Sequence, residues 1–579
     1  MLKSYFHDLL GKESTMKNFK LYRSESVHDL REMLERSCAA RPDKAVFFQK
    51  ENGEYKAHTY GEFYCDVNSL GVALLRRGLK GKRIIVLGEN SYAWCVSYMA
   101  VVCGVGTVVP VDKEIPAEEL ANIAKVSSAG AIIYSEKYEE KAKLSGKRIQ
   151  KIPFGEAMEL CQESYSLAEY AEYRDISIDI DEMASLIFTS GTTGVSKGVM
   201  LSHRNICCNL ENLAKLVSID EKDTALSVLP LHHVYECTAG FLFPISRGAS
   251  VAFSEGVRYI MKNMKEIHPT KMLCVPLLIE TMYNKMWANI RKKGIEEKVR
   301  NVIKATNMLP EPARSAAKRK VFHEIHASMG GKLNLIVSGG APVDPQVLSG
   351  LRDFGFRVIQ GYGLTECGPL AAVNPDFAPK DHSAGVALPG GQLKIVDADE
   401  EGVGEICYRG DNVMLGYYKM PEATDEVKKN GWLHTGDLGY IDHDGYLVIT
   451  GRKKNIIVTA NGKNIFPEEL ETYLSRSPYV KESVIVGIMN DKKKDYDIVA
   501  LIYPDFDHAK EVFGLYASDE MISEKLGEEV EKVNGMVQTY KRINMVMMRH
   551  EEFPKNSSRK IKRIGLVESV MEDYLYKRG

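Results

Sequence analysis

The residue types best suited to chemistry follow a hydrophobic run that ends at Thr189. They combine glycines, hydroxyls and one lysine in the order Ser190-Gly191-Thr192-Thr193-Gly194-Val195-Ser196-Lys197-Gly198. Glycines let a backbone wrap closely around an anion, hydroxyl and N–H groups donate hydrogen bonds, and Lys197 adds a positive charge. We therefore predict a polyphosphate site whose binding residues run from Thr189 to Gly194. It is not a Walker loop, because Ser196 rather than glycine precedes the lysine.

The same stretch also fits the GxSxG pattern of the α/β-hydrolase nucleophile elbow, with Ser196 as the nucleophile. That elbow requires a strand that ends at the serine and a helix that begins directly after it. The hydrophobic strand here ends about seven residues earlier, so we disfavour a serine hydrolase. An ordinary flexible loop is the other alternative, because Gly, Ser and Thr are common turn residues.

Two further segments have residues suited to binding a nucleotide. In GYGLTE (361–366), Tyr362 places a flat ring between Gly361 and Gly363, Thr365 can donate to a phosphate, and Glu366 can bind Mg²⁺. In SGGAPV (338–343), a strand end is followed by a Gly-Gly turn, which lets the backbone approach a flat base closely. A tight turn with a core tyrosine and a surface glutamate is the alternative for GYGLTE.

These motifs, together with GWLHTGDLG (431–439), GRKKNIIVTANGKNIFPEELE (451–471) and PKNSSRKIKR (554–563), resemble in order the signatures of the adenylate-forming superfamily. That superfamily contains acyl-CoA synthetases, carrier-charging adenylation domains and luciferases, and the resemblance covers nearly the whole chain. It implies that Asp437 accepts the ribose hydroxyls with support from Arg452, and that Lys454 is a hinge. The implied ATP/AMP-binding residues also include Gly340, Ala341, Pro342, Gly361, Tyr362 and Gly363.

The resemblance implies a reaction in two steps. ATP first converts a carboxylate to an acyl-adenylate, with Mg²⁺ held by Glu366 and Thr189, and with Lys197 and Lys560 neutralising charge. Arg559 replaces the common glycine before Lys560, and Lys562 is its nearest rival. A thiol then displaces AMP after the C-terminal domain rotates, and Gly462 lines the thiol tunnel. We favour His233 over His232 as the residue between the acyl and thiol channels; a buried structural histidine is the alternative for both.

The substrate follows from two features. PLHHVYE (230–236) lacks the Phe-Asp pair with which amino-acid-activating domains hold an amine, and the helical insertion over 280–328 resembles long-chain fatty acid ligases. We expect a medium-to-long-chain fatty acid and coenzyme A as co-substrates of ATP. A phosphopantetheine-bearing acyl carrier protein is the alternative acceptor, because it ends in the same thiol. A nucleotide-binding scaffold without catalysis is disfavoured by the intact Glu366, Lys197 and Lys560. The apolar side chains expected near the acyl group are Cys237, Phe241, Leu242, Phe243, Leu277, Leu278, Met282 and Leu370.

Alternating apolar strands and amphipathic segments must position these residues. Strand candidates at 83–90, 107–111, 131–135, 185–189, 224–230 and 333–340 indicate an α/β architecture with parallel sheets and crossover helices. We predict an N-terminal domain (1–453) of two such subdomains plus a small β subdomain, whose turn-rich hairpins begin near Gly385. A small, mobile α+β C-terminal domain (454–579) follows.

Composition excludes several other classes. The 579 residues contain 76 Lys+Arg and 78 Asp+Glu, which does not fit a basic nucleic-acid binder or a disordered acidic chain. The uncharged segment 91–111 contains Gly104, Gly106 and Pro110, and we interpret it as a helix followed by a buried strand rather than a membrane span. Peripheral membrane contact stays compatible with this pattern. Eleven dispersed cysteines without a CxxC pair, and no signal-peptide pattern at the start, predict a cytoplasmic protein.

Overall fold

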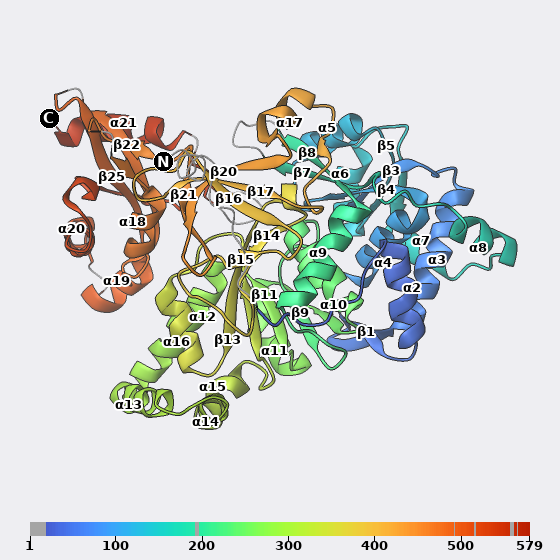
Figure 1. Cartoon of the computed structure of the whole chain (residues 1–579), viewed down its shortest axis with the longest axis horizontal. Helices are drawn as coiled ribbons and strands as arrows, with labels where there is room; N and C mark the ends of the chain where they lie inside the picture. The colour runs from blue at the N-terminus through green and yellow to red at the C-terminus, as the bar shows by residue number, and fades with distance from the viewer. Residues whose placement is uncertain are drawn as a thin grey trace, which may run out of the picture.

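The computed structural model describes residues 19–190, 196–461, 463–490, 492–514, 517–555, 561–563 and 565–578. The chain forms two α/β sheets, a small antiparallel sheet and a C-terminal α+β unit (Figure 1), and strands that are distant in the sequence share each α/β sheet. This confirms the predicted fold class. No helix among the described residues is long and apolar enough to cross a membrane.

The first α/β half is built on a sheet with the strand order β18-β8-β7-β4-β3-β5-β6. Its strands are β3 (Lys82–Leu87), β4 (Gly106–Val111), β5 (Ala129–Tyr134), β6 (Gln150–Pro153), β7 (Met183–Ser190), β8 (Ser196–Ser202) and β18 (Gly416–Tyr417). The helices between them include α3 (Tyr60–Arg76), α4 (Tyr92–Ala100), α5 (Ala117–Ser127), α7 (Phe154–Cys161) and α9 (His203–Leu216). The strands from β3 to β7 pair in parallel, as predicted, and α4 with β4 accounts for the uncharged segment 91–111. The antiparallel strands β8 and β18 were not predicted.

The second α/β half has the strand order β15-β14-β13-β12-β11-β9-β10-β1-β2. Its strands are β1 (Ala45–Glu51), β2 (Glu54–Thr59), β9 (Thr224–Ser227), β10 (Ser250–Phe253), β11 (Lys271–Cys274), β12 (Leu335–Ser338), β13 (Arg357–Gly363), β14 (Leu370–Val373) and β15 (Val386–Ala387). Its helices include α2 (Leu30–Ala40), α11 (Ile260–Ile267), α12 (Pro276–Lys292), α13 (Glu296–Asn307), α14 (Ala313–Val321), α15 (His323–Ser328) and α16 (Pro345–Asp353). The helices α12 to α15 form the predicted helical insertion.

A small antiparallel sheet and the C-terminal unit complete the chain. The sheet contains β16 (Gln392–Val396), β17 (Gly404–Arg409), β19 (Lys428–Lys429), β20 (Trp432–Ile441) and β21 (Leu447–Arg452), with α17 (Pro421–Val427) beside it. The C-terminal unit contains β22 (Ile457–Val458), β23 (Asn464–Ile465), β24 (Val480–Asn490), β25 (Asp495–Pro504) and β26 (Met545–Met548). Its helices are α18 (Pro467–Leu474), α19 (Phe506–Phe513), α20 (Asp519–Asn534) and α21 (Leu566–Arg578).

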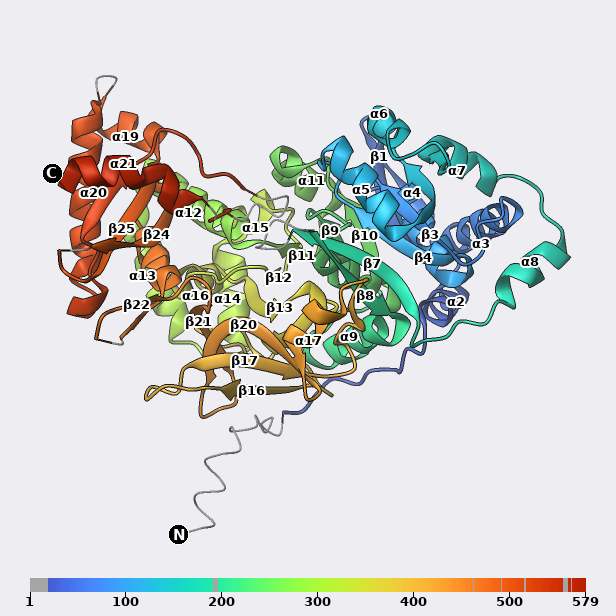
Figure 2. The same cartoon turned by 90° about the horizontal axis from the view of Figure 1, so that it is seen from above.

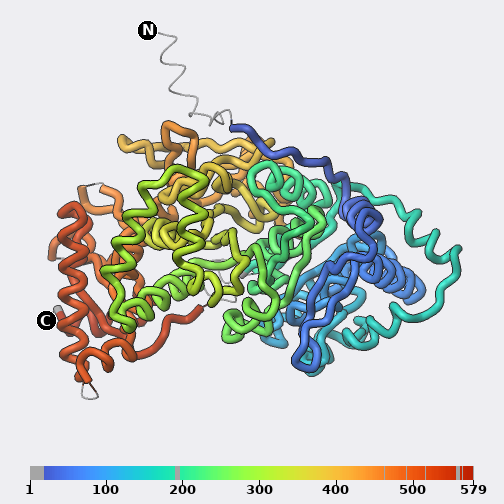
Figure 3. The backbone as a smooth tube through the Cα atoms, turned by 90° about the horizontal axis from the view of Figure 1, so that it is seen from below, coloured from blue at the N-terminus to red at the C-terminus, as the bar shows by residue number. Residues whose placement is uncertain are grey.

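The C-terminal unit lies at one end of the molecule and has hydrophobic clusters of its own. Figures 1 and 2 place its orange and red elements beside α12 and α16, and in Figure 3 the red tube runs along the yellow-green helices. The two α/β halves instead share one large core that contains side chains from both sheets. The C-terminal unit is therefore the part of the chain least tied to the rest by apolar packing.

Candidate active site

Strands β7 and β8 bring together the two ends of the predicted phosphate loop. Thr189 pairs with Lys197 in the antiparallel register. The Thr189 hydroxyl donates to the Lys197 carbonyl oxygen at 3.4 Å, and the Lys197 ammonium lies 4.7 Å from the ring centre of Tyr417. Lys197 on β8 is therefore held by a cation–π contact with a tyrosine of the neighbouring strand β18.

Tyr417 links this lysine to the predicted magnesium ligand. Its hydroxyl donates to Glu366 Oε1 at 2.7 Å, and burial, followed by the negative charge of Glu366, raises the pKa of the tyrosine above its usual value. The hydroxyl thus stays protonated and fixes the carboxylate. Glu366 itself lies in a short 3₁₀ helix, Thr365–Cys367, directly after β13, together with Thr365.

Sequence reasoning missed Tyr417. Its position is set by β18, where it pairs with Val199 of β8 more than 200 residues earlier in the chain. The short segment Leu415 to Lys419 has two adjacent tyrosines after a glycine, which is the local signal that was available. Nothing in that segment alone indicates which tyrosine faces the glutamate.

Three other predicted residues converge at the junction of two sheets. The Tyr362 hydroxyl donates to Asp437 Oδ2 at 2.7 Å, and Arg452 Nε lies 2.8 Å from Asp437 Oδ1. Asp437 and Arg452 are register partners in β20 and β21. Burial, then the charge of Asp437, raises the pKa of Tyr362 well above its usual value, so the hydroxyl remains a donor. A buried carboxylate held from two sides is suited to accept a pair of hydroxyl groups.

The remaining loop residues follow β12. Gly340 has a φ of +88°, which glycine adopts readily, and Ala341 and Pro342 are exposed beside it. The ring of Tyr235 packs on Gly339, where an added Cβ would lie 2.9 Å from the ring, and its hydroxyl donates to the Val337 carbonyl at 3.2 Å. The segment 230–236 is thereby fixed against the SGG turn.

The two adjacent histidines have different surroundings. Their ring centres lie 4.2 Å apart, His232 is buried and His233 is half-buried. Burial, followed by the nearby charges of His233 and Lys113, lowers the pKa of His232 well below its usual value and keeps it neutral. His232 thus fits a structural role, and the more accessible His233 stays the predicted channel residue.

Glu236, four residues after His232, was also missed. Its side chain is wholly buried, and burial raises its pKa to about 8. An added Cβ on Gly240 would lie 2.6 Å from the Glu236 carboxyl carbon, so the absence of a side chain at position 240 makes room for this group. An acidic residue inside an apolar segment is the signal that the sequence contained.

The serine hydrolase interpretation is wrong. Ser196 begins β8, so a strand rather than a helix follows it, and its hydroxyl donates to Glu119 Oε1 at 2.7 Å. Several other predicted residues lie outside the described residues, namely Gly191, Thr192, Thr193, Gly194, Gly462 and Lys560, and only the backbone of Ser190 is described. Lys454 is exposed at the predicted hinge, where β21 has just ended.

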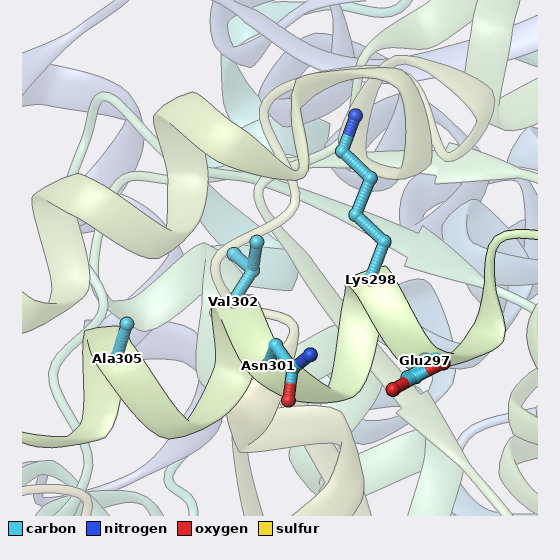
Figure 4. A pocket seen from close by; sticks show the side chains of 5 residues that line it. All are labelled: Glu297, Lys298, Asn301, Val302 and Ala305. Atoms are coloured by element: carbon cyan, nitrogen blue, oxygen red, sulfur yellow. The ribbon is translucent and has the colours of Figure 1, made fainter.

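The side chains expected around the acyl group divide into core and surface. Phe241 contacts Trp94 and Tyr98 edge-to-face within the shared core, whereas Leu277 is 55% exposed. A shallow depression of about 490 Å³ lies elsewhere, on α13, with Lys298, Val302 and Ala305 among its lining residues (Figure 4). None of these residues belongs to the motifs, so this depression is separate from the candidate active site.

Comparison with known proteins shows to which family this chain belongs. The model of the AMP-binding enzyme family matches residues 34–418, and the model of an AMP-binding enzyme C-terminal domain matches residues 454–573. The chain belongs to the AMP-binding enzyme family.

Curated relatives of this AMP-binding enzyme include long-chain-fatty-acid–CoA ligases. The chain is 29% identical over 489 residues to ligase 1 of Cavia porcellus, covering 75% of this chain and 68% of that protein. It is 27% identical to ligase 5 of Mus musculus, and the match covers 92% of this chain and 85% of that protein. A solved ATP-bound MatB from Rhodopseudomonas palustris has a TM-score of 0.74 at 22% identity, covering 94% of this chain and 100% of that one. The solved structure of a Mycobacterium tuberculosis fatty acyl CoA synthetase has a TM-score of 0.64 at 22% identity, and the match covers 95% of this chain and 99% of that one.

Proposed function

We propose that the chain is a ligase that activates a medium-to-long-chain fatty acid with ATP and transfers it to the thiol of coenzyme A. The observation that carries the proposal is that the segment 361–366 takes part in two clusters, Tyr362 with Asp437 and Arg452, and Glu366 with Tyr417 and Lys197. The names of the curated relatives support the fatty acid and the coenzyme A acceptor. The acyl carrier protein gains no such support.

In the first step, Asp437 would accept the two ribose hydroxyls while Arg452 holds its other side. The Tyr362 hydroxyl keeps the carboxylate oriented, and Gly340 to Pro342 offer backbone to the base. A substrate carboxylate oxygen then attacks the α-phosphorus, and pyrophosphate leaves towards Lys197. Each of these groups is positioned before the substrates arrive, which reduces the reorganisation needed in the transition state.

The residues present also fit Mg²⁺. No group of three or more His, Cys, Asp or Glu side chains that could hold a metal occurs among the described residues. In nucleotide enzymes Mg²⁺ commonly takes only one or two protein ligands and completes its shell with water and phosphate oxygens, and the Glu366 carboxylate with the Thr189 hydroxyl supplies that number. When bound with ATP, the ion would neutralise charge on the phosphates.

In the second step, the thiol attacks the acyl-adenylate carbonyl and AMP leaves. We propose that the C-terminal domain rotates about Lys454 between the steps, that Lys560 serves only the first, and that Gly462 and His233 border the thiol path. The first step takes place at the α-phosphorus and the second at the neighbouring acyl carbonyl carbon, so two orientations can supply different groups to each step and shield the adenylate from water.

The experiment that tests this proposal is an AMP-release assay with purified chain, ATP and Mg²⁺ across fatty acids of increasing length. Coenzyme A and a holo acyl carrier protein are compared as acceptors. We expect AMP release that requires both a fatty acid and coenzyme A, with the highest kcat/KM for medium or long chains. Faster turnover with the carrier protein would reassign the acceptor, and release with amino acids alone would refute the substrate class.

A further inference from the structure

An ion pair joins the C-terminal unit to the residue that directly follows the proposed nucleotide loop. Arg476, just after α18, places Nε 2.9 Å from Asp344 Oδ2 and Nη2 3.3 Å from Asp344 Oδ1. Asp344 directly follows the SGGAPV segment and is 6% exposed. Such a two-pronged contact to a buried carboxylate has a fixed geometry, unlike a surface ion pair.

Both partners are pre-positioned. The guanidinium of Arg476 stacks on the ring of Tyr473 in α18, with its central carbon 4.8 Å from the ring centre. Asp344 is the N-cap of α16, and its Oδ1 accepts the backbone N–H of Gln346 at 2.9 Å. The arginine thus meets the carboxylate at the start of α16, and only Val343 separates Asp344 from the segment Gly340 to Pro342, so a displacement of Asp344 is transmitted to that segment.

A second carboxylate, that of Glu280, lies near Asp344, so the loss of Arg476 would leave two neighbouring acidic groups without this cation. Burial raises the pKa of Glu280 on α12, and the negative charge of Asp344 adds to that shift. The N-terminal half therefore presents two neighbouring acidic groups where the C-terminal unit presents a cation. Withdrawing Arg476 would leave a buried carboxylate next to a like charge, which is unfavourable.

The orientation in which this pair forms can be assigned. The segment proposed to line the thiol path has exposed residues at Ala460, Asn461 and Lys463. The Ala460 N–H donates to Asp495 of the same unit, and Asn464 contacts Asp399 of the small sheet at 3.4 Å. Within the described part of the chain, residues 459–461 and 463–464 make no hydrogen bond or ion pair with the ends of β12 or β13. The thiol-path segment is therefore outside the site in this orientation, which matches the adenylate-forming step.

We propose that Arg476 and Asp344 are positioning residues that hold the C-terminal unit in the adenylate-forming orientation and couple it to the nucleotide loop. This inference rests on the proposed function. The pair must break before the thiol step, so its strength sets the balance between the two half-reactions.

The test uses Asp344→Asn, which removes the charge but keeps a good helix cap, Arg476→Gln, and the double variant. We expect each to lower fatty-acid-dependent exchange of labelled pyrophosphate into ATP about 10-fold, with no further loss in the double variant. Thioester formation from supplied acyl-adenylate and coenzyme A should stay within about 2-fold, and Arg476→Lys should restore part of the exchange. Lys541→Gln is the matched control, because Lys541 pairs with Glu469 inside the C-terminal unit at 2.7 Å.

Equal losses in both half-reactions, additive losses in the double variant, or the same loss from Lys541→Gln would overturn the proposal. Absence of exchange in the unmodified chain would instead sink the proposed function. The ion pair could then still be tested by amide hydrogen exchange, since Arg476→Gln should speed the exchange of backbone amide hydrogens in the first turn of α16. An unchanged rate of amide hydrogen exchange there would refute the coupling.

Discussion

At the residue scale, the site depends on tyrosine hydroxyls that orient carboxylates. Tyr362 holds Asp437 and Tyr417 holds Glu366, each at 2.7 Å. Tyr362, Asp437 and Glu366 could be predicted because their motifs are local and ordered. Tyr417 could not, because its role arises from a strand pairing across more than 200 residues, which no local pattern encodes.

The contact between Tyr417 and Glu366 leads to a first prediction. Tyr417→Phe should lower the adenylation rate about 10-fold, because a hydrogen bond to a charged group contributes on the order of 1.5–3 kcal/mol, and should raise the KM for Mg·ATP. Tyr418→Phe is the matched control, since that ring faces Arg83 and Lys419 instead. An equal effect of both substitutions, measured as pyrophosphate exchange, would show that Tyr417 does not act through Glu366.

Glu236 leads to a prediction about pH. Its pKa is about 8 in the folded chain against an ordinary value of 4.5, so the folded state holds a proton that the unfolded state loses. The contribution of Glu236 to the free energy of unfolding should therefore be fully present below about pH 4.5. It should fall as the pH rises towards 8, by up to about 1.4 kcal/mol per pH unit. Glu236→Gln should remove this part of the fall in melting temperature between pH 6 and 8.5. Parallel melting curves for the two proteins would contradict this.

At the element scale, the parallel strands β3, β4, β5, β7, β9 and β12 were predicted because each is a local apolar run, whereas β1, β6, β10, β11 and β13 were not among the strand candidates. The antiparallel strand β8 was not predicted either, because it begins in a Ser-Lys-Gly sequence that has no strand periodicity of its own until Val199. Its pairing with β7 decides its structure. That pairing also places Lys197 opposite Thr189 and excludes the hydrolase elbow.

The turn after β13 is tested by a small substitution. In Gly363→Ala the new Cβ would overlap the carbonyl oxygen of Pro369, so the loop that carries Glu366 must shift. We expect loss of pyrophosphate exchange and a lower melting temperature, with about 1–3 kcal/mol of destabilisation. Gly527→Ala in α20 is the control, since nothing lies within 4 Å of its added Cβ, and it should stabilise the helix by about 0.5–1 kcal/mol. An active Gly363→Ala variant would show that the turn is not required.

At the scale of the whole molecule, a formal charge of −2 leaves the binding of an anionic nucleotide to a few placed cations. Lys197 and Arg452 come from different sheets, and we propose Lys560 from the C-terminal domain as the third. The ordered motifs in the sequence predict these three cations. The contact between the N-terminal part and the C-terminal unit through Arg476 and Asp344 has no local sequence pattern. Domain contacts of this kind depend on the tertiary arrangement alone.

Lys560→Ala tests the division between the domains. It should reduce adenylation by at least about 100-fold, because it removes a charge that acts on the transferring phosphoryl group, yet it should leave thioester formation from supplied acyl-adenylate nearly unchanged. Lys562→Ala is the matched control from the same basic segment. Loss of both half-reactions in Lys560→Ala would refute a role confined to the first step, and a larger loss in Lys562→Ala would reassign that role.

The central claim is that the chain makes an acyl-adenylate from a fatty acid, and isotope exchange tests it most directly. The unmodified chain is incubated with ATP, Mg²⁺, labelled pyrophosphate and one fatty acid, without coenzyme A. We expect label in ATP only when the fatty acid is present, with rates that depend on chain length. Absence of exchange with every carboxylate tested would contradict it.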